Sequence, residues 1–261
     1  MLPRQELLEG ASDPAALKPV IAAAEEALRT WQPVWTAFLP AELREQAEAR
    51  LGTLSDLSLH SEGGHSGAER RRLLLQRTDA ATDPGEVETG LQGLEISGNF
   101  LFDPAEPGDV RAALLAAGAE AGELGDIWMR GDRGAQAITT ATLARRLQGL
   151  AVQVRTVPVE LTSRPIGDLH VPAQRAHKRL TSVEASLRLD ALASAGFGMS
   201  RNRMAELIRQ GAVRLNWQPI TSPSRELAAG DRVQLEGRGE LLLEELALTK
   251  RDRWRVTLVR R

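Results

Sequence analysis

The residues best suited to chemistry lie on a short basic segment in the last third of the chain. At the 100° spacing of an α-helix, Arg203 and Arg209 share one face of the segment 200–210, and its apolar residues share another face. Arg201 falls in the first turn, where backbone N–H groups have no partner inside the helix. Guanidinium groups beside a helix N-terminus favour phosphate binding. A solvated polar face would have the same periodicity, so the pattern alone leaves both interpretations open.

The residues that flank this segment predict where the helix begins and ends. Ser200 has the side chain of an N-cap, and Gly211 is the residue type that most often follows a helix. A strand is expected over 213–216, where Arg214 and Asn216 alternate with apolar residues. The sequence therefore predicts further polar side chains on a strand beside the basic helix.

Motifs for catalysis are missing from the sequence. It contains neither a Gly-x-Gly-x-x-Gly fingerprint, nor a phosphate-binding Walker loop, nor a Gly-x-Ser-x-Gly elbow. Cysteine is absent, and the four histidines lack the spacing of a metal site. No pair of carboxylates is singled out by its spacing. We therefore expect a protein that is not an enzyme and that uses neither a metal nor a cofactor.

Charge is distributed unevenly along the 261 residues. The net charge is −2, but residues 183–261 carry 14 basic and 10 acidic side chains, a net charge of +4, which leaves −6 for residues 1–182. A basic module on an acidic body suggests an anionic partner for that module, although a charge of this size is also common in proteins without one. No apolar run is long enough for a transmembrane segment, and the N-terminus does not resemble a signal peptide. A cytoplasmic location is therefore expected.

Hydrophobic periodicity predicts an α+β protein in four parts. Residues 1–65 read as a helical N-terminal region, and residues 66–162 read as a mixed middle domain that opens with a strand over 71–77. Residues 163–182 are expected to be a basic linker, and residues 183–261 a compact C-terminal module.

The middle domain has a recognisable order of elements. Strands are expected over 91–98, 127–130, 135–139 and 152–159, and helices over 110–117 and 140–147. This is the β-α-β-β-α-β order of ferredoxin-like and RRM-like domains. The third of these strands lacks the aromatic residues with which an RRM stacks bases.

The C-terminal module is predicted to contain two helices followed by a small sheet. The helices are expected over 184–194 and 200–210, and the strands over 213–216, 232–235, 241–246 and 254–259. Its motifs resemble the S4 RNA-binding domain. They are Arg188-Leu189-Asp190, Gly198 to Arg201, Leu207 to Gly211, Val213 to Asn216 and Gly230-Asp231.

This resemblance implies that the module grips structured RNA with a helix–turn–helix pair on a small sheet. It assigns phosphate contacts to Arg188, Arg201, Arg203, Arg209 and Arg214, and it places Asn216 at the edge of the surface. Ser200 and Gly211 would be structural caps. The implied partner is structured RNA, above all ribosomal RNA in a ribosomal subunit.

Further motifs resemble the photosystem II S4 domain protein family of cyanobacteria and plastids, which is close to the YlmH-like RNA-binding proteins. They include Gly98 to Pro104, Gly131 to Gln136, Val154 to Val159 and Thr249 to Arg255. This wider resemblance implies RNA binding, ribosome association and a role in photosystem II biogenesis or translation. Two alternatives remain. One is a photosystem II assembly factor, at the periphery of thylakoids, whose S4 fold binds protein. The other is an rRNA-modifying enzyme, which is the least favoured because no catalytic domain accompanies the module.

Overall fold

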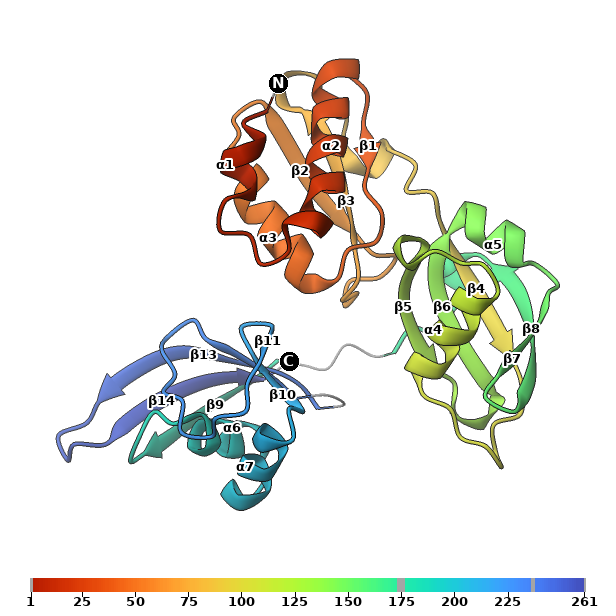
Figure 1. Ribbon diagram of the computed structural model, residues 1–261. Helices are drawn as coiled ribbons and strands as arrows, with labels where there is room; N and C mark the ends of the chain where they lie inside the picture. Colours follow the sequence, from red (N-terminus) through yellow and green to blue (C-terminus); the bar gives the residue numbers. More distant parts are fainter. Residues whose placement is uncertain (1, 173–176, 236–237, 261) are drawn as a thin grey trace. The chain divides into compact units, whose positions relative to one another are not determined.

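The computed structural model describes residues 2–172, 177–235 and 238–260, and the chain forms two compact units, 1–173 and 174–261. Helices and antiparallel sheets occur in both units (Figure 1), which confirms the predicted α+β class. No helix in the described part of the chain is long and apolar enough to cross a membrane.

The first part of unit 1 contains three helices and a three-stranded sheet. The helices are α1 (Arg4–Leu8), α2 (Pro14–Thr30) and α3 (Ala41–Leu51), and the strands are β1 (Val34–Trp35), β2 (Leu57–Glu62) and β3 (Arg72–Arg77). Helix α2 begins as predicted, because the Asp13 carboxylate accepts a hydrogen bond from the backbone N–H of Ala16 at 2.9 Å and Pro14 follows it. Leucines of β3 pack against α2 in one core.

This sheet changes the predicted division of the chain. Residues 57–62, inside the region predicted to be helical, form β2. The strand predicted to open the middle domain is β3, and it lies between β1 and β2 in the order β1-β3-β2. Residues 73–76 of β3 are all buried, and a continuous buried run carries no information about which strands it pairs with.

The middle part of unit 1 is a five-stranded sheet with two helices. Its elements are β4 (Leu91–Ser97), α4 (Pro107–Ala116), β5 (Leu124–Met129), β6 (Gly134–Thr140), α5 (Ala141–Leu147), β7 (Ala151–Val154) and β8 (Val157–Arg164). The order β5-β6-β4-β8-β7 is the ferredoxin-like order 2-3-1-4 with one strand added at the edge. Residues from both helices lie with those of the strands in one core.

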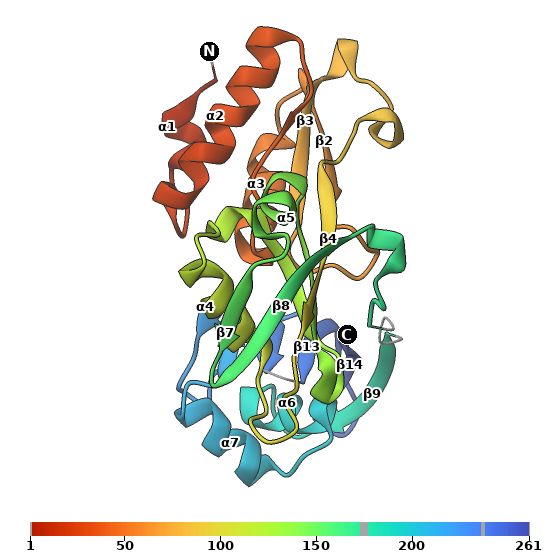
Figure 2. The same ribbon diagram turned by 90° about the vertical axis from the view of Figure 1, so that its right-hand side faces the viewer.

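The extra strand comes from a segment that the sequence predicts as one strand. Residues 151–164 fold back as the β7–β8 hairpin (Figure 2), with Arg155 at a positive φ of 55° in the turn. The Asp103 carboxylate accepts hydrogen bonds from the side chain of Arg155 at 2.7 Å and from the hydroxyl of Thr156 at 2.6 Å. Valines alternate on each side of the turn, but the step from Val154 to Val157 is three residues, and this break in the period of two is the sequence signal that the single predicted strand passed over.

The face of this sheet opposite its helices is covered by protein. Leu169 and Phe38 pack with Ile138 and Trp128 over that face. The indole N–H of Trp128 donates to the carbonyl of His170 at 3.0 Å, which holds the segment after β8 in place. The surface on which an RRM stacks bases is therefore occupied within unit 1.

One half-buried carboxylate, with a side chain that is 18% exposed, ties the two parts of unit 1 together. Asp126 on β5 accepts hydrogen bonds from the backbone N–H groups of Glu69 at 2.8 Å and Arg70 at 2.9 Å. Nε2 of His65 lies 3.3 Å from the same carboxylate. Burial would raise the pKa of Asp126, but these partners outweigh burial and hold the pKa below its ordinary value.

Unit 2 is a six-stranded antiparallel sheet that carries two helices on one face. The helices are α6 (Leu189–Phe197) and α7 (Arg201–Arg209), and the strands are β9 (Lys178–Glu184), β10 (Val213–Leu215), β11 (Gln218–Pro219), β12 (Arg232–Leu235), β13 (Gly239–Leu248) and β14 (Trp254–Arg260). The strand order is β11-β10-β12-β13-β14-β9. In the described residues of unit 1, five short 3₁₀ helices also occur, at Thr78–Ala80, Pro84–Glu86, Ala121–Glu123, Gly131–Arg133 and Ile166–Asp168.

The structure differs from two predictions around strand β9, namely the linker over 163–182 and the start of the helix over 184–194. The predicted linker, 163–182, contains the end of β8 and most of β9, while its residues 173–176 lie outside the described part of the chain. The helix predicted over 184–194 begins only at Leu189, because Arg188 is extended with ψ 142°. Strand β9 forms because β14 offers it a complete antiparallel partner, which the local sequence does not reveal.

Candidate nucleic-acid interface

Helix α7 turns its basic side chains to solvent. The hydroxyl of Ser200 accepts a hydrogen bond from the backbone N–H of Arg203 at 3.3 Å and caps the helix. Met204 and Ile208 are buried in the core of the unit, whereas Arg203 and Arg209 are exposed. The helical spacing of the sequence thus gives one face that packs on the sheet and one basic face that is open.

A buried carboxylate joins the starts of α6 and α7. The Asp190 side chain is only 7% exposed. It accepts hydrogen bonds from Nε and Nη2 of Arg188 at 3.1 and 3.0 Å and from Nη2 of Arg201 at 3.0 Å. Burial would raise the pKa of Asp190, but the two guanidinium groups outweigh burial and hold the pKa below its ordinary value. Asp190 is therefore an anion that fixes the direction of both arginines.

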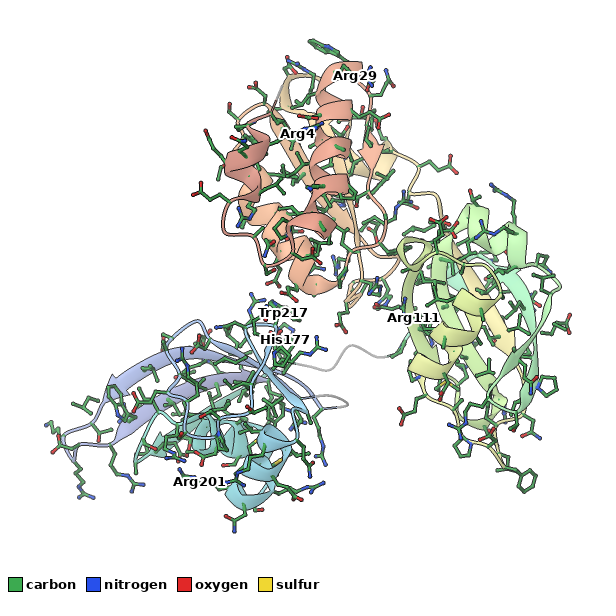
Figure 3. All side chains as sticks on the ribbon, in the orientation of Figure 1. Arg4, Arg29, Arg111, His177, Arg201 and Trp217 are labelled. Atoms are coloured by element: carbon green, nitrogen blue, oxygen red, sulfur yellow. The ribbon has the colours of Figure 1, made fainter. Side chains whose placement is uncertain are left out.

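Both guanidinium groups remain open to a ligand. The side chain of Arg188 is 39% exposed and that of Arg201 is 51% exposed. Figure 3 shows Arg201 at the start of α7, beside α6. A guanidinium has five N–H donors, and Asp190 uses two of Arg188 and one of Arg201. The remaining N–H donors of the two guanidinium groups are held in a fixed planar geometry and can bind phosphate oxygens.

The two arginines on the outer face of α7 differ in their ionic surroundings. Nη1 of Arg203 lies 2.6 Å from the carboxylate of Glu206, one turn further along. Arg209 has no ion pair with any residue that the structure describes. A phosphate must compete with Glu206 for Arg203, so Arg209 is the more available of the two.

Arg214 lies apart from this group. It stands on β10 between the buried side chains of Val213 and Leu215, which pack with the helices. Because side chains alternate along a strand, Arg214 points to the opposite face of the sheet. The structure therefore brings Arg188, Arg201 and the arginines of α7 to the helical side and leaves Arg214 on the other side.

Asn216 has a structural task in the turn between β10 and β11. Its φ is +48°, its side-chain amide donates to Asp231 at 2.8 Å, and its side-chain carbonyl accepts from the backbone N–H of Arg232 at 2.9 Å. Each end of the amide makes one hydrogen bond to the chain. Asn216 thus joins this turn to the Gly230-Asp231 turn and has one N–H donor and one carbonyl lone pair beyond these two bonds.

Asp190 is the site residue whose role only the structure shows. It belongs to the Arg188-Leu189-Asp190 motif, but the sequence analysis assigns it no role, although an acid in the first turn of an otherwise apolar helix is a signal that could have singled it out. Gly211 adopts a φ of 77°, and its backbone N–H donates to the carbonyl of Ile208 at 3.0 Å, which ends α7. In the described ranges, no three histidine or acidic side chains gather as metal ligands.

Comparisons with protein families match both ends of the chain. The S4 domain model matches residues 187–233, which span α6, α7 and the strands as far as the beginning of β12. The model described as "YlmH, N-terminal" matches residues 12–80, from just before α2 to just past β3. This second match also places β3 with the N-terminal helices.

Individual proteins are also similar to this chain. The chain is 30% identical over 207 residues to the "Ribosome-associated protein quality control protein P2" of Bacillus subtilis, and the match covers 79% of each chain. A solved structure, "Cell division protein ylmH from Streptococcus pneumoniae", matches with a TM-score of 0.48 and 20% identity over 59% of this chain and 91% of that one.

Proposed function

Because this chain belongs to the YlmH family of S4-domain proteins, we propose that it is a non-enzymatic protein that binds structured ribosomal RNA or a ribosomal subunit through its S4 domain. The name of the Bacillus subtilis relative describes a ribosome-associated protein, which supports a ribosomal partner for this chain. A cytoplasmic location is part of this proposal.

The observation that carries the proposal is the pair of arginines held by Asp190. Arg188 and Arg201 come from the starts of two different helices and meet at one buried carboxylate. Their guanidinium groups are oriented before any ligand arrives, so little side-chain entropy is lost on binding. Guanidinium groups with a fixed orientation suit the phosphates of a folded RNA, because the backbone geometry of that RNA is also fixed. This favours recognition of RNA shape over recognition of base sequence.

Sedimentation with purified bacterial ribosomal subunits tests this proposal. The wild-type chain should co-sediment with a subunit at low salt, and nuclease or high salt should release it, because phosphate contacts weaken steeply as salt rises. The double variant R188Q/R201Q should remain at the top of the gradient under the same conditions. The matched control K18Q/R29Q removes two exposed cations from α2 and should behave like the wild type. Equal release of both double variants would contradict the assignment of these arginines.

The choice of binding over catalysis is tested separately. The sequence carries no nucleotide-binding loop or catalytic motif beside the S4 domain. We expect neither tritium release nor methyl transfer when the purified protein is incubated with ribosomal RNA. Robust turnover in either assay would replace the proposed binding function with rRNA modification.

The link to photosystem II is a finer proposal that rests on the resemblance described above. Protein binding is a second candidate activity, and one observation favours it. Phe102 is 91% exposed and Leu101 is 57% exposed, on a loop of the middle domain whose neighbour Asp103 is fixed by Arg155 and Thr156. A rigid loop that exposes apolar side chains is suited to a protein groove.

A pulldown from a cyanobacterial extract distinguishes these roles. If the chain is a photosystem II assembly factor at the thylakoid periphery, photosystem II subunits should remain bound after nuclease treatment, and Phe102→Ser should release them. If the chain acts through translation, nuclease should release them, and the Phe102 variant should behave like the wild type.

A further inference from the structure

The far half of the β13–β14 hairpin is a part of unit 2 that the helices do not cover. The pairing of the two strands shifts between Leu243 and Glu245, and beyond this irregularity residues 244, 245, 247 and 248 of β13 are exposed. Figure 1 shows this end of the hairpin reaching beyond α6 and α7. The hairpin therefore extends past the hydrophobic core that stabilises the rest of the unit.

The tip of this hairpin is closed by its own hydrogen bonds. The backbone N–H of Thr249 donates to the carbonyl of Arg253 at 2.7 Å, and the N–H of Asp252 donates to the carbonyl of Thr249 at 3.1 Å. The hydroxyl of Thr249 also accepts from the backbone N–H of Arg253 at 3.2 Å. The tip is therefore a hydrogen-bonded turn, and its hydrogen bonds hold the backbone of the residues that carry the exposed side chains in place.

Four exposed cations lie at this tip and at the start of β14, next to Asp252 and to Glu184, which pairs with Trp254. They are Lys250, Arg251, Arg253 and Arg255. None of the four forms an ion pair with a described residue. The arginines of the candidate interface differ in this respect, because Arg188 and Arg201 are paired with Asp190 and Arg203 is paired with Glu206.

Uncompensated like charges repel one another, and a ligand that removes this repulsion gains free energy on binding. Three of the four cations are arginines, whose forked donors match phosphate oxygens. Among the described residues, Leu248 is 60% exposed at this end, and Val183, which pairs with Arg255 across β9 and β14, is 46% exposed, while Trp254 packs against the edge of the core. Two exposed aliphatic side chains beside four cations offer little apolar area for insertion into a lipid surface, so the chemistry favours an RNA backbone.

We propose that the β13–β14 hairpin tip is a second RNA-binding surface, which contacts the phosphates of a different segment of the RNA that α6 and α7 bind. This inference rests on the proposed function of the S4 domain. The two surfaces belong to one unit, so a folded RNA that reaches both is bound more tightly than either surface alone would bind it.

The test uses purified bacterial ribosomal RNA as the probe and salt as the variable. The variant K250Q/R251Q/R253Q/R255Q removes the four hairpin cations, which are all exposed. The control K18Q/R29Q/R133Q/R145Q removes four exposed cations from unit 1 and changes the net charge by the same amount. If the hairpin contacts three or four phosphates, the slope of log K against log salt should become shallower by about 2–3 in the hairpin variant, and affinity at moderate salt should fall about tenfold or more. The control should match the wild type.

A cleavage experiment tests the claim of two RNA segments. The chain has no cysteine, so a single introduced cysteine can carry an iron chelate that cleaves nearby RNA. Leu248→Cys, on the hairpin, and Asn202→Cys, on α7, should cut the ribosomal RNA at separate sites. A single shared site would overturn the proposal of two segments.

The outcomes separate this inference from the proposed function. If the wild-type chain does not bind ribosomal RNA, the proposed function fails and the inference fails with it. If the wild-type chain binds and the hairpin variant binds equally well, or loses no more than the control, the hairpin is not an RNA contact and the proposed function stands. Flotation with phosphatidylglycerol vesicles tests whether the hairpin binds a lipid surface instead of RNA. Vesicle binding that is lost in the hairpin variant while RNA binding is unchanged would overturn the inference.

Discussion

At the scale of single residues, Asp190 decides how the candidate interface is arranged. An aspartate that is almost wholly buried would be costly if it were unpaired, but its two arginine partners satisfy it and extend their remaining donors into solvent. Arg188 and Arg201 then have one carboxylate in common, although they come from different helices. Their energies should therefore be coupled to that of Asp190 and not additive with it.

This coupling gives the first prediction. Asp190→Asn removes the negative charge and leaves both guanidinium groups in place. The loss of free energy of unfolding that Arg201→Gln causes should be smaller by about 1 kcal/mol in the Asp190→Asn background than in the wild type. Urea unfolding of the four proteins of this double-mutant cycle measures the difference. Independent, additive effects would show that the hydrogen bond between these two side chains does not contribute to stability.

The same substitution separates positioning from charge in RNA binding. If phosphates contact Arg201 directly, Arg201→Gln should make the salt slope shallower by about 1. Asp190→Asn removes no cation, so it should leave the slope close to that of the wild type while affinity falls. Titrations of ribosomal RNA over a range of salt concentrations check both values, and a slope that changes equally in both variants would contradict a positioning role.

At the scale of elements, the turn before β6 has a strict requirement for glycine at one position. Gly134 has a φ of +138°, and a Cβ built there would lie 2.1 Å from the carbonyl oxygen of Ile96 on the neighbouring strand. Gly131, three residues earlier, has a φ of +66° and no atom within 4 Å of such a Cβ. A side chain at position 131 would therefore meet only backbone strain, whereas a side chain at position 134 would also clash with the neighbouring strand.

These two glycines give the third prediction. Gly131→Ala should cost about 1 kcal/mol, the usual cost of a left-handed conformation for a residue with a Cβ. Gly134→Ala should cost at least about 2 kcal/mol more, because β4 and β6 must also move apart. Thermal or urea unfolding of the two variants is a direct comparison. Equal losses would mean that the start of β6 adjusts without disturbing β4.

The N-cap of α7 is a second local feature, and its effect on stability can be measured separately from any effect on RNA binding. Ser200→Ala should lower the free energy of unfolding by about 1 kcal/mol, because the backbone N–H of Arg203 loses its acceptor. No cation is removed, so the salt slope of RNA binding should not change. A shallower slope in this variant would indicate that the hydroxyl of Ser200, or the position of the helix start, affects phosphate contacts directly.

At the scale of the whole molecule, Asp126 connects the N-terminal and middle parts of unit 1. Because its folded-state pKa lies below its ordinary value of 3.8, the stability that it contributes is complete above that ordinary value. This contribution is lost as the pH falls from 3.8 through the lowered pKa of the folded state. Acid should therefore loosen this connection as the carboxylate becomes protonated.

The variant Asp126→Asn tests this dependence on pH. At neutral pH it should reduce the free energy of unfolding by about 2 kcal/mol, since an uncharged amide cannot satisfy all the donors around it. The difference between wild type and variant should shrink as the pH falls below 3.8. Urea unfolding at several pH values measures it, and a constant difference down to strongly acidic pH would exclude the Asp126 carboxylate as the titrating group.

The sequence by itself determined the features that depend on neighbouring residues. Helix α7, its cap Ser200 and its basic outer face follow from helical spacing and from local hydrogen bonding between a side chain and the backbone. The β-α-β-β-α part of the middle domain follows for the same reason, since each of these strands and helices has its own period, whereas the last predicted strand is the β7–β8 hairpin.

Only the tertiary structure decided the features that depend on distant residues. Strand β3 joins the N-terminal sheet and β9 joins the C-terminal one, because each finds its partner far away in sequence and its own pattern fits several environments. Asp190 unites Arg188 with Arg201 because two helices meet there. Arg214 is directed to the opposite face of the sheet because Val213 and Leu215 are buried against the helices. Local periodicity determines which face of an element is apolar, whereas long-range pairing and packing determine what that face meets.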